Sequence, residues 1–274
     1  MDTNDVVTQS PLGKDTEYIN SYDPSLLYPI ARDTNWQAQG IDRETLPFKG
    51  VDIWNAYELS WINHRGKPEV RLAEFRVFAD SKNIIESKSF KLYLNSFNLS
   101  KFASQKEVEA LLIKDLSEAA EGRVTVRIYH PDQAPEFGQF TGFCIDNQDV
   151  DITAYTPAPD LLFTGEDEVE EVLYSHLLKS NCPVTGQPDW ATLGISYSGK
   201  EIDREGLLKY IISYREHGDF HEQCVENIFM HIWERCKPDS LNVYARYVRR
   251  GGLDINPFRS SEMDDIDNLR LSRQ

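Results

Sequence analysis

Apolar and polar residues alternate in four short segments of this chain. Apolar side chains occupy every second position at 73–77 and 124–128, and the same pattern returns at 193–197 and 241–247. A period of two is typical of a strand with one buried face. We therefore predict two strands in each half of the chain, with Gly199 turning the chain after the third.

Helical periods fill the intervals between these strands. Ser104 and Glu107 have the S-x-x-E spacing of a capping box, in which the serine accepts from the backbone and the glutamate reaches back. The helix predicted after this box carries Val108 and Leu112 on its apolar face and stops at Gly122. The other predicted helices span 83–97, 203–215 and 219–235.

The order strand, helix, helix, strand thus occurs twice, which predicts an α+β protein of tandem modules. Its sheets should be antiparallel, with the helices on one face. The predicted division, from the N-terminus, is an arm packed on the body (1–50), a first module (51–145), an acidic connector (146–174) that includes GEDEVEE at 165–171, and a second module (175–274) that carries the candidate nucleophile.

Composition narrows the possible partners. The 274 residues include 29 Lys and Arg against 45 Asp and Glu, a net charge of −16, which argues against a nucleic-acid backbone as the main partner. No apolar run is long enough to span a membrane, and the first residues lack a secretory pattern. We therefore expect a cytoplasmic protein whose four cysteines are free thiols.

The segment from Ser180 to Trp190, SNCPVTGQPDW, is the strongest local signal for chemistry. Two prolines and a glycine predict an irregular loop, so Cys182 is not expected in a helix core. Asp189 follows seven positions later, far enough for the loop to fold back. A thiolate nucleophile with a neighbouring carboxylic acid as proton donor is a workable pair. The alternative interpretation is a buried structural cysteine.

Two further clusters are open to more than one interpretation. His217, His221 and Cys224 have spacings that could ligate zinc on one helical face, but Gly218 interrupts them and no fourth ligand has an obvious spacing. His221 with Glu222 fits better as a polar pair over a pocket, or as a capping pair at the surface. The basic, glycine-ended segment 244–252 suits a phosphate, or a salt-bridge strip at a sheet edge.

Four longer segments together resemble one known family. They are IESKSFKLYLNSF at 85–97, SHLLKSNCPVTGQPDW at 175–190, FHEQCVE at 220–226 and YARYVRRGGLDINP at 244–257. The chain is similar along nearly its whole length to the 7-cyano-7-deazaguanine reductases, the NADPH-dependent nitrile reductases of tRNA queuosine biosynthesis, in their long two-module form.

The resemblance implies the tunnelling fold, built from repeated ββαα units. It also implies roles for individual residues: Cys182 as nucleophile, Asp189 as proton donor and His221 as an orienting or proton-relaying group. The implied substrate contacts are Ile85, Glu86, Ser87, His221 and Glu222. The implied NADPH contacts are Ser87, Lys88, Arg250 and Gly251.

The activity implied by the resemblance is a four-electron reduction of the nitrile of 7-cyano-7-deazaguanine to an aminomethyl group. It would proceed through a covalent cysteine thioimide, with two NADPH per turnover and no metal, in a cytoplasmic homodimer that binds no nucleic acid directly. Two other functions remain open: a zinc-dependent hydrolase of the same fold, resembling GTP cyclohydrolases and using His217, His221 and Cys224, and a nucleobase-binding module with an inert thiol.

Overall fold

The computed structural model describes residues 17–274, so the part of the predicted arm at 1–16 lies outside the described residues. The chain forms two compact units that interleave in sequence. The first contains the described residues up to Glu44, together with Asp52–Glu136 and Arg249–Asp254. The second contains Thr45–Val51, Phe137–Val248 and Ile255–Gln274.

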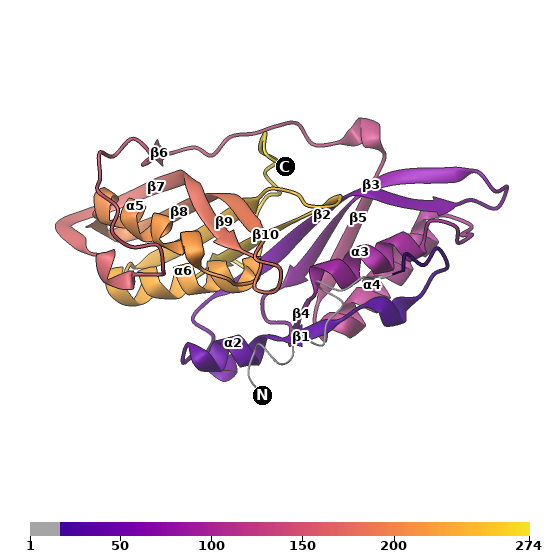
Figure 1. Ribbon diagram of the computed structural model, residues 1–274, viewed down its shortest axis with the longest axis horizontal. Coiled ribbons are helices and arrows are strands. Elements are labelled where there is room, and N and C mark those ends of the chain that lie inside the picture. Colours follow the sequence, from indigo (N-terminus) through magenta and orange to yellow (C-terminus); the bar gives the residue numbers. More distant parts are fainter. Residues whose placement is uncertain (1–16) are drawn as a thin grey trace. The chain divides into compact units, whose positions relative to one another are not determined.

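The first unit has three antiparallel strands, β2, β3 and β5, with the helices α3 and α4 packed on them. Its main elements are β2 (Lys49–Ile62, most of which lies in this unit), β3 (Pro68–Phe78), the short strand β4 (Asn83–Ile85) outside this sheet, α3 (Ser87–Ser96), α4 (Gln105–Ala120) and β5 (Val124–Tyr129). The strand order is β5-β3-β2, and β3 pairs with β5 from Leu72↔Tyr129 to Val77↔Val124. Figure 1 shows α3 and α4 side by side on one face of these strands.

The N-terminus of α4 confirms the serine half of the predicted capping box, whereas the glutamate accepts from the residue before the N-cap. The Ser104 hydroxyl accepts from the Glu107 amide at 3.3 Å, and the Glu107 carboxylate accepts from the Ala103 amide at 2.7 Å. The helix ends at Ala120, where Glu121 adopts the left-handed conformation (φ 44°) just before Gly122. The helix predicted over 83–97 differs at its start, because Asn83–Ile85 form β4 and only Ser87–Ser96 are helical.

The described part of the arm contains short regular elements. They are η1 (Pro24–Leu26), β1 (Pro29–Ala31), α2 (Arg32–Ala38) and η2 (Arg43–Thr45). Strand β1 pairs with β4, and the buried Arg32 guanidinium forms an ion pair with Asp52. The Tyr22 ring packs edge-on against Phe97, and its hydroxyl donates to Asp115 at 2.6 Å. Tertiary contacts of this kind hold elements too short to be stable alone.

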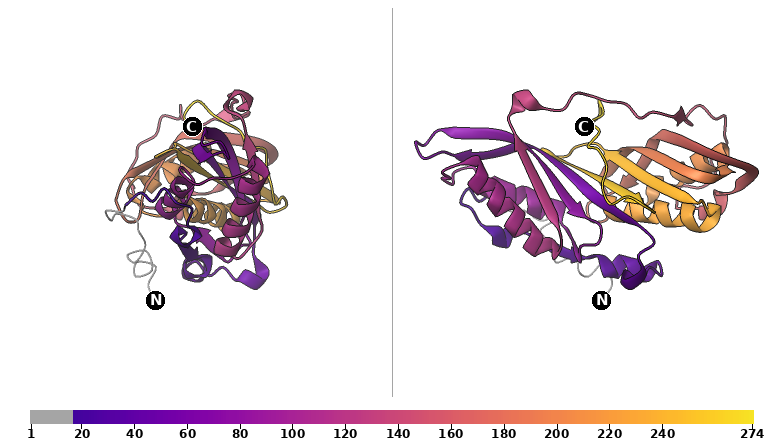
Figure 2. Two further views of the ribbon diagram at one scale, coloured as in Figure 1. Left: turned by 90° about the vertical axis from the view of Figure 1, so that its right-hand side faces the viewer. Right: turned by 180° about the vertical axis from the view of Figure 1, so that it is seen from behind.

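The second unit repeats the strand, strand, helix, helix order. Its main elements are β6 (Phe143–Cys144), β7 (Thr164–Asn181), β8 (Pro188–Ile202), α5 (Arg204–Ile212), α6 (His221–Cys236), β9 (Ser240–Tyr247) and β10 (Leu253–Ser260, most of which lies in this unit). It also contains the short helices η4 (Pro159–Leu161) and η5 (Ser213–Glu216). A further short helix, η3 (Pro131–Gln133), belongs to the first unit. The strand order is β10-β9-β8-β7-β6, antiparallel except for two parallel pairs between β6 and β7. Figure 2 shows α5 and α6 running along the strands of this unit.

Two predictions are wrong in this unit. The segment 165–171, predicted as part of an acidic connector, lies in β7, where Glu168 pairs with Lys200 and Glu170 with Ser198. Glu166, Asp167, Glu168 and Glu170 are exposed and Glu171 is half-buried, so this acidic segment is part of the sheet. Gly199 does not turn the chain either. It continues β8 at φ +137°, where an added Cβ would lie 3.1 Å from the Pro238 Cα.

The predicted fold class is confirmed. Each unit combines antiparallel strands with a pair of longer helices, α3 and α4 in the first and α5 and α6 in the second, and the ββαα order that defines a tunnelling-fold module occurs twice. Among the described residues, no helix is both long and apolar enough to cross a membrane. The division of the chain at 50, 145 and 174 stays a prediction.

Candidate functional site

Cys182 lies at the closed end of the β7–β8 hairpin. Strand β7 ends at Asn181 and β8 begins at Pro188, so the irregular loop is shorter than predicted. Pro188 is tolerated as the first residue of a strand, where its missing N–H costs no ladder bond. The Cys182 amide donates to the Gln187 carbonyl at 2.9 Å, and the Gly186 amide donates to the Cys182 carbonyl at 3.0 Å. These bonds hold the buried thiol at a fixed point of the turn.

Asp189 is the second residue of β8, directly after the loop that carries Cys182. It pairs with Ser180 in the β7–β8 register, and Ser180 and Cys182 are two positions apart. Both Asp189 and Cys182 are buried, at 4% and 6% exposed. Neither side chain is therefore exposed to bulk water.

His221 contacts Asp189 and is held on two sides. Its Nε2 lies 3.3 Å from the Asp189 Oδ1, and its Nδ1 lies 3.2 Å from the Ile255 carbonyl oxygen. The imidazole stacks on the Tyr247 ring, with the planes 7° apart and the centroids 3.7 Å apart. Because a carbonyl oxygen can only accept, Nδ1 carries a hydrogen. Nε2 then faces the Asp189 carboxyl, so an imidazole nitrogen and a carboxyl oxygen lie side by side.

The first turn of α6 presents His221 and Glu222 together. Glu222 is 3% exposed, and its position at a helix N-terminus stabilises a negative charge. Asp219 fixes the entry to the helix, because its Oδ1 accepts from the Phe220 amide at 3.0 Å and its Oδ2 accepts from the Asn227 amide group at 3.0 Å. Burial raises the pKa of Asp219. His221 and Glu222 are both buried, which does not fit the alternative of a capping pair at the surface.

The two cysteines of α6, Cys224 and Cys236, are poor candidates for the nucleophile. Burial raises the pKa of Cys224 to about 12 and that of Cys236 to about 11, so both are thiols at neutral pH. A thiol is far less nucleophilic than a thiolate. His217, His221 and Cys224 also do not form a metal-ligand group within the described residues, since His217 pairs with Asp219 at 3.2 Å. The zinc-hydrolase alternative is therefore not favoured.

The remaining predicted residues lie in the first unit. Ile85 ends β4, and Glu86 is the fully buried N-cap of α3. The Glu86 carboxylate accepts from the Lys88 and Ser89 amides at 2.6 and 2.8 Å, and burial raises its pKa. Ser87 is the first residue of the helix. Glu86 thus has a structural task, which sequence reasoning did not anticipate.

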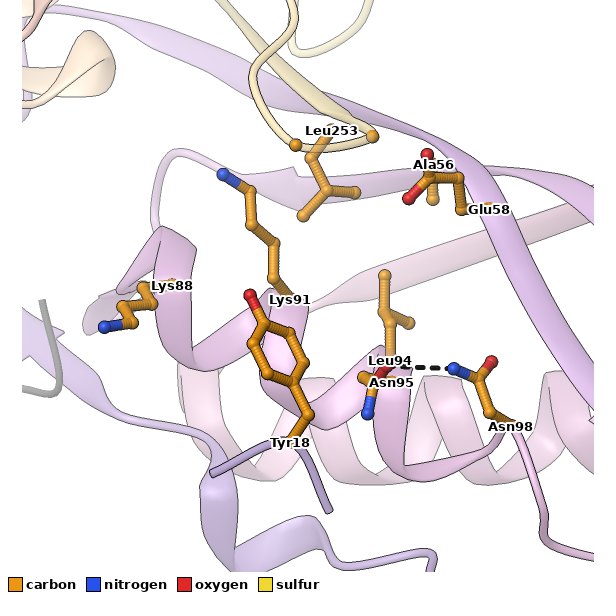
Figure 3. Close-up of a pocket in the computed structure, with 11 residues that line it drawn as sticks. Tyr18, Ala56, Glu58, Lys88, Lys91, Leu94, Asn95, Asn98 and Leu253 are labelled. Atoms are coloured by element: carbon orange, nitrogen blue, oxygen red, sulfur yellow. Dashed lines mark hydrogen bonds between the residues drawn. The ribbon is translucent and has the colours of Figure 1, made fainter. Parts of the chain in front are cut away.

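A cavity of about 420 Å³ brings two predicted cofactor contacts together (Figure 3). Lys88 from α3 and Gly251 from the turn before β10 both line it, whereas Arg250 is not among its lining residues. Gly251 has φ +57°, and an added Cβ there would lie 3.3 Å from the Lys91 Nζ. The cavity also includes Tyr18, Ala56, Glu58, Lys91, Leu94, Asn95, Asn98, Gly252 and Leu253.

Lys91 is the residue of this cavity that sequence reasoning missed. It lies one helical turn after Lys88 on α3, so both ammonium groups can serve the same pocket. The i, i+3 spacing of two lysines was the available signal. Of the arginines near the turn, Arg249 lies over the Tyr57 ring, 5.0 Å from its centroid.

Comparison with known proteins gives a consistent result. Residues 18–128 match the family "Nitrile reductase, 7-cyano-7-deazaguanine-reductase N-term", and residues 188–265 match the family "QueF-like protein". The chain is 55% identical over 257 residues to the NADPH-dependent 7-cyano-7-deazaguanine reductase of Azoarcus sp. (strain BH72), covering 93% of this chain and 92% of that protein. The protein of the same name from Albidiferax ferrireducens is also 55% identical, over 285 residues, covering 97% and 98%.

One solved structure, an archaeosine synthase QueF-Like in its apo form, covers 36% of this chain and 98% of its own, with 18% identity and a TM-score of 0.31. The fold assignment rests on the chain's own topology. The fold and the site together define a class of protein. It has two ββαα modules, a cysteine at the end of a hairpin and a buried Asp–His pair. Within that class, the chain belongs to the family of 7-cyano-7-deazaguanine reductases.

Proposed function

We propose that the chain is an NADPH-dependent reductase that converts the nitrile of 7-cyano-7-deazaguanine into an aminomethyl group, a step of tRNA queuosine biosynthesis. Family membership at 55% identity supports the activity. The observation that carries the mechanism is the β7–β8 hairpin, which holds the buried Cys182 and the buried Asp189, with His221 3.3 Å from Asp189.

Cys182 is the proposed nucleophile. Its thiolate adds to the nitrile carbon, which has no leaving group, and the C–N triple bond becomes the double bond of a thioimide. The nitrogen gains negative charge in this step, so a proton must reach it. Asp189 is the proposed donor, with His221 orienting it or relaying the proton. The 3.3 Å contact between the His221 Nε2 and the Asp189 Oδ1 supports this assignment.

The electron count sets the rest of the reaction. Bound NADPH supplies hydride, and two molecules per turnover account for the four electrons between nitrile and amine. After the first reduction, the tetrahedral carbon expels the Cys182 sulfur as a thiolate and leaves an imine. The second reduction and a second proton give the aminomethyl product, so the protein is restored without an external oxidant or a metal.

Substrate recognition is assigned to buried carboxyl and imidazole groups. A deazaguanine presents N–H donors along one edge, and the carboxylate of Glu222 can accept two of them. Breaking such a buried pair is costly because the ligand's donors lose their acceptor. His221, the residue before Glu222, is proposed to contact the same substrate. Ile85, Glu86 and Ser87 are proposed as further substrate contacts on the strength of the resemblance.

The cavity beside α3 is the proposed site for the phosphates of NADPH. Two lysines and a glycine turn with positive φ suit a phosphate, because the ammonium groups neutralise its charge and the turn leaves backbone room. The proposed contacts are Lys88, Lys91 and Gly251 in the cavity, together with Ser87 and Arg250 beside it. The volume of about 420 Å³ fits part of a dinucleotide.

Lys91→Met should raise the KM for NADPH by about 10–100-fold while kcat changes little. A hydrogen bond between charged groups contributes about 1.5–3 kcal/mol, which corresponds to that range. The measurement is steady-state NADPH oxidation at saturating nitrile. Lys106→Met is the matched control, because Lys106 is an exposed residue of α4 in the same unit and carries the same charge. A KM within twofold of the unsubstituted protein would remove Lys91 from the cofactor site.

The activity itself is tested by mixing the full chain with 7-cyano-7-deazaguanine and NADPH. We expect NADPH absorbance to fall only when the nitrile is present, with two NADPH consumed per aminomethyl product counted by mass spectrometry. Activity should survive chelators. Binding of the nitrile without NADPH oxidation would instead indicate a nucleobase-binding module, and loss of activity with chelator would indicate a metal-dependent enzyme.

The proposal extends to the direct partner, the oligomeric state and the location of the protein. A net charge of −16 supports a small molecule, and not a nucleic acid, as the direct partner. The homodimeric state and the cytoplasmic location are proposed from the resemblance.

A further inference from the structure

Cys144, Asp146 and His176 form a cluster that the proposed reaction does not use. One ligand atom from each residue lies within 4.8 Å of the other two, and among the described residues this is the one such group of three. A thiol, a carboxylate and an imidazole are the three ligand types that bind zinc in proteins. His176 is exposed, and Cys144 and Asp146 are half-buried, so an ion from solvent can reach them.

The short pairing between β6 and β7 creates this cluster. Phe143 pairs with Leu173 and Cys144 with Tyr174, and the Ile145 amide donates to the Tyr174 carbonyl at 3.0 Å. This register brings Asp146 alongside the next two residues of β7. The cluster therefore joins residues 30 positions apart at one edge of the sheet.

Neighbouring groups fix the Asp146 carboxylate in place. Its Oδ1 accepts from the Ser175 hydroxyl at 2.6 Å, and its Oδ2 accepts from the His176 amide at 3.0 Å. Each oxygen retains a lone pair after accepting one hydrogen bond. A ligand carboxylate held by hydrogen bonds loses little freedom when an ion binds, as in characterised metal sites.

A buried hydroxyl orients the His176 ring. The Thr192 Oγ1 lies 3.0 Å from Nδ1, and Thr192 is only 1% exposed. An outer partner on one ring nitrogen is the usual way in which proteins set a metal-binding histidine, leaving the other nitrogen for the ion. A second cavity, of about 340 Å³, borders both His176 and Thr192 and offers room for water or a small ligand.

Arg273 sets the charge balance of the cluster. Its guanidinium donates to the His176 carbonyl at 3.1 Å and is attracted electrostatically by Asp146. Without an ion, Arg273 therefore offsets the charge of Asp146. When a divalent cation binds, the same guanidinium opposes it. Arg273 thus lowers the affinity of the site and provides a residue whose removal should raise it.

We propose that Cys144, Asp146 and His176 bind one thiophilic divalent cation of the zinc class, with a fourth position left to water. Binding converts the Cys144 thiol to a thiolate and releases its proton to solvent. Because the ligands come from β6 and its flank and from β7, the ion fastens a strand that is otherwise held by two register pairs. The inference concerns stability, and it does not depend on the proposed reductase activity.

The test uses the full chain after treatment with a chelator. Titration with Co²⁺ should give one equivalent of binding with a thiolate-to-cobalt absorption band, and Zn²⁺ should displace the band. Cys144→Ser should abolish it, and Asp146→Asn or His176→Gln should weaken binding by at least about tenfold. Arg273→Gln should tighten binding. Cys236→Ser, at a buried cysteine outside the cluster, should leave the titration unchanged.

Thermal unfolding provides the second readout. Zn²⁺ should raise the Tm of the unsubstituted chain and of Arg273→Gln, and it should leave the Tm of Cys144→Ser unchanged. Equal Tm values without metal establish that the variants fold. The proposal is overturned if no cobalt band forms at micromolar protein, or if the band persists in Cys144→Ser. NADPH oxidation that survives the chelator keeps this result separate from the fate of the reductase assignment.

Discussion

Cys182→Ala should lose nitrile reduction by three or more orders of magnitude and form no covalent adduct. Removing a catalytic nucleophile leaves only binding and electrostatic effects, and losses of this size or greater are typical. The measurement is the intact mass of the protein after incubation with 7-cyano-7-deazaguanine in the absence of NADPH. The unsubstituted chain should gain the mass of one nitrile, because the thiol adds across the triple bond and nothing leaves.

The control for this experiment is another buried cysteine. Cys236→Ala removes a thiol at the end of α6, whose pKa burial raises to about 11, and this variant should keep the adduct. Both variants lose one sulfur atom, so a difference between them reports on position and not on thiol content. If Cys182→Ala still gains the mass of the nitrile, the thioimide mechanism is wrong.

Local chemistry allowed parts of the fold to be predicted from sequence. Ser104 and Glu107 meet through bonds within one turn, so the S-x-x-E spacing was sufficient to predict the start of α4. Strands with one solvent-facing side, such as β5, show the period of two directly. Cys182 and Asp189 belong to one hairpin, and a hairpin is itself a local structure.

Strand β10 escaped prediction because its polar residues are buried and paired over long distances. All eight of its residues are buried, so no alternation survives. Asp254 accepts from the Asn55 side chain at 2.7 Å, and the Arg259 guanidinium lies 2.7 Å from the Glu226 carboxylate. Partners 199 and 33 residues away cannot be identified from spacing. A sequence that appears polar was therefore part of a core.

The same limit applies to the candidate site. Sequence reasoning predicted Asp189 and His221 separately, but nothing in their spacing showed that the two side chains lie 3.3 Å apart. The stacking of His221 on Tyr247 is equally invisible in the sequence, because α6 and β9 meet only in the folded unit. Lys91 is a further case. It is a candidate cofactor contact only because the fold places Gly251 beside its ammonium group.

Asp189→Asn should slow adduct formation by about 10²–10⁴-fold, the usual contribution of a positioned proton donor. Asparagine has nearly the same size and can still contact His221, but its amide cannot supply the proton that the thioimide nitrogen needs. The rate is measured as the growth of adduct mass under single-turnover conditions. Affinity is measured separately, by titrating the nitrile into the Cys182→Ala background, where it should change far less than the rate.

Glu170→Gln is the matched control, since it neutralises an exposed carboxylate of β7. A rate for Asp189→Asn within threefold of the control would exclude Asp189 as the donor. The double variant Asp189→Asn/His221→Gln gives the sharper result. Because the proposed mechanism has the two side chains act in one proton transfer, removing both should cost no more than the larger single loss. Multiplicative losses would mean that His221 and Asp189 act in separate steps, and that the contact between them is structural.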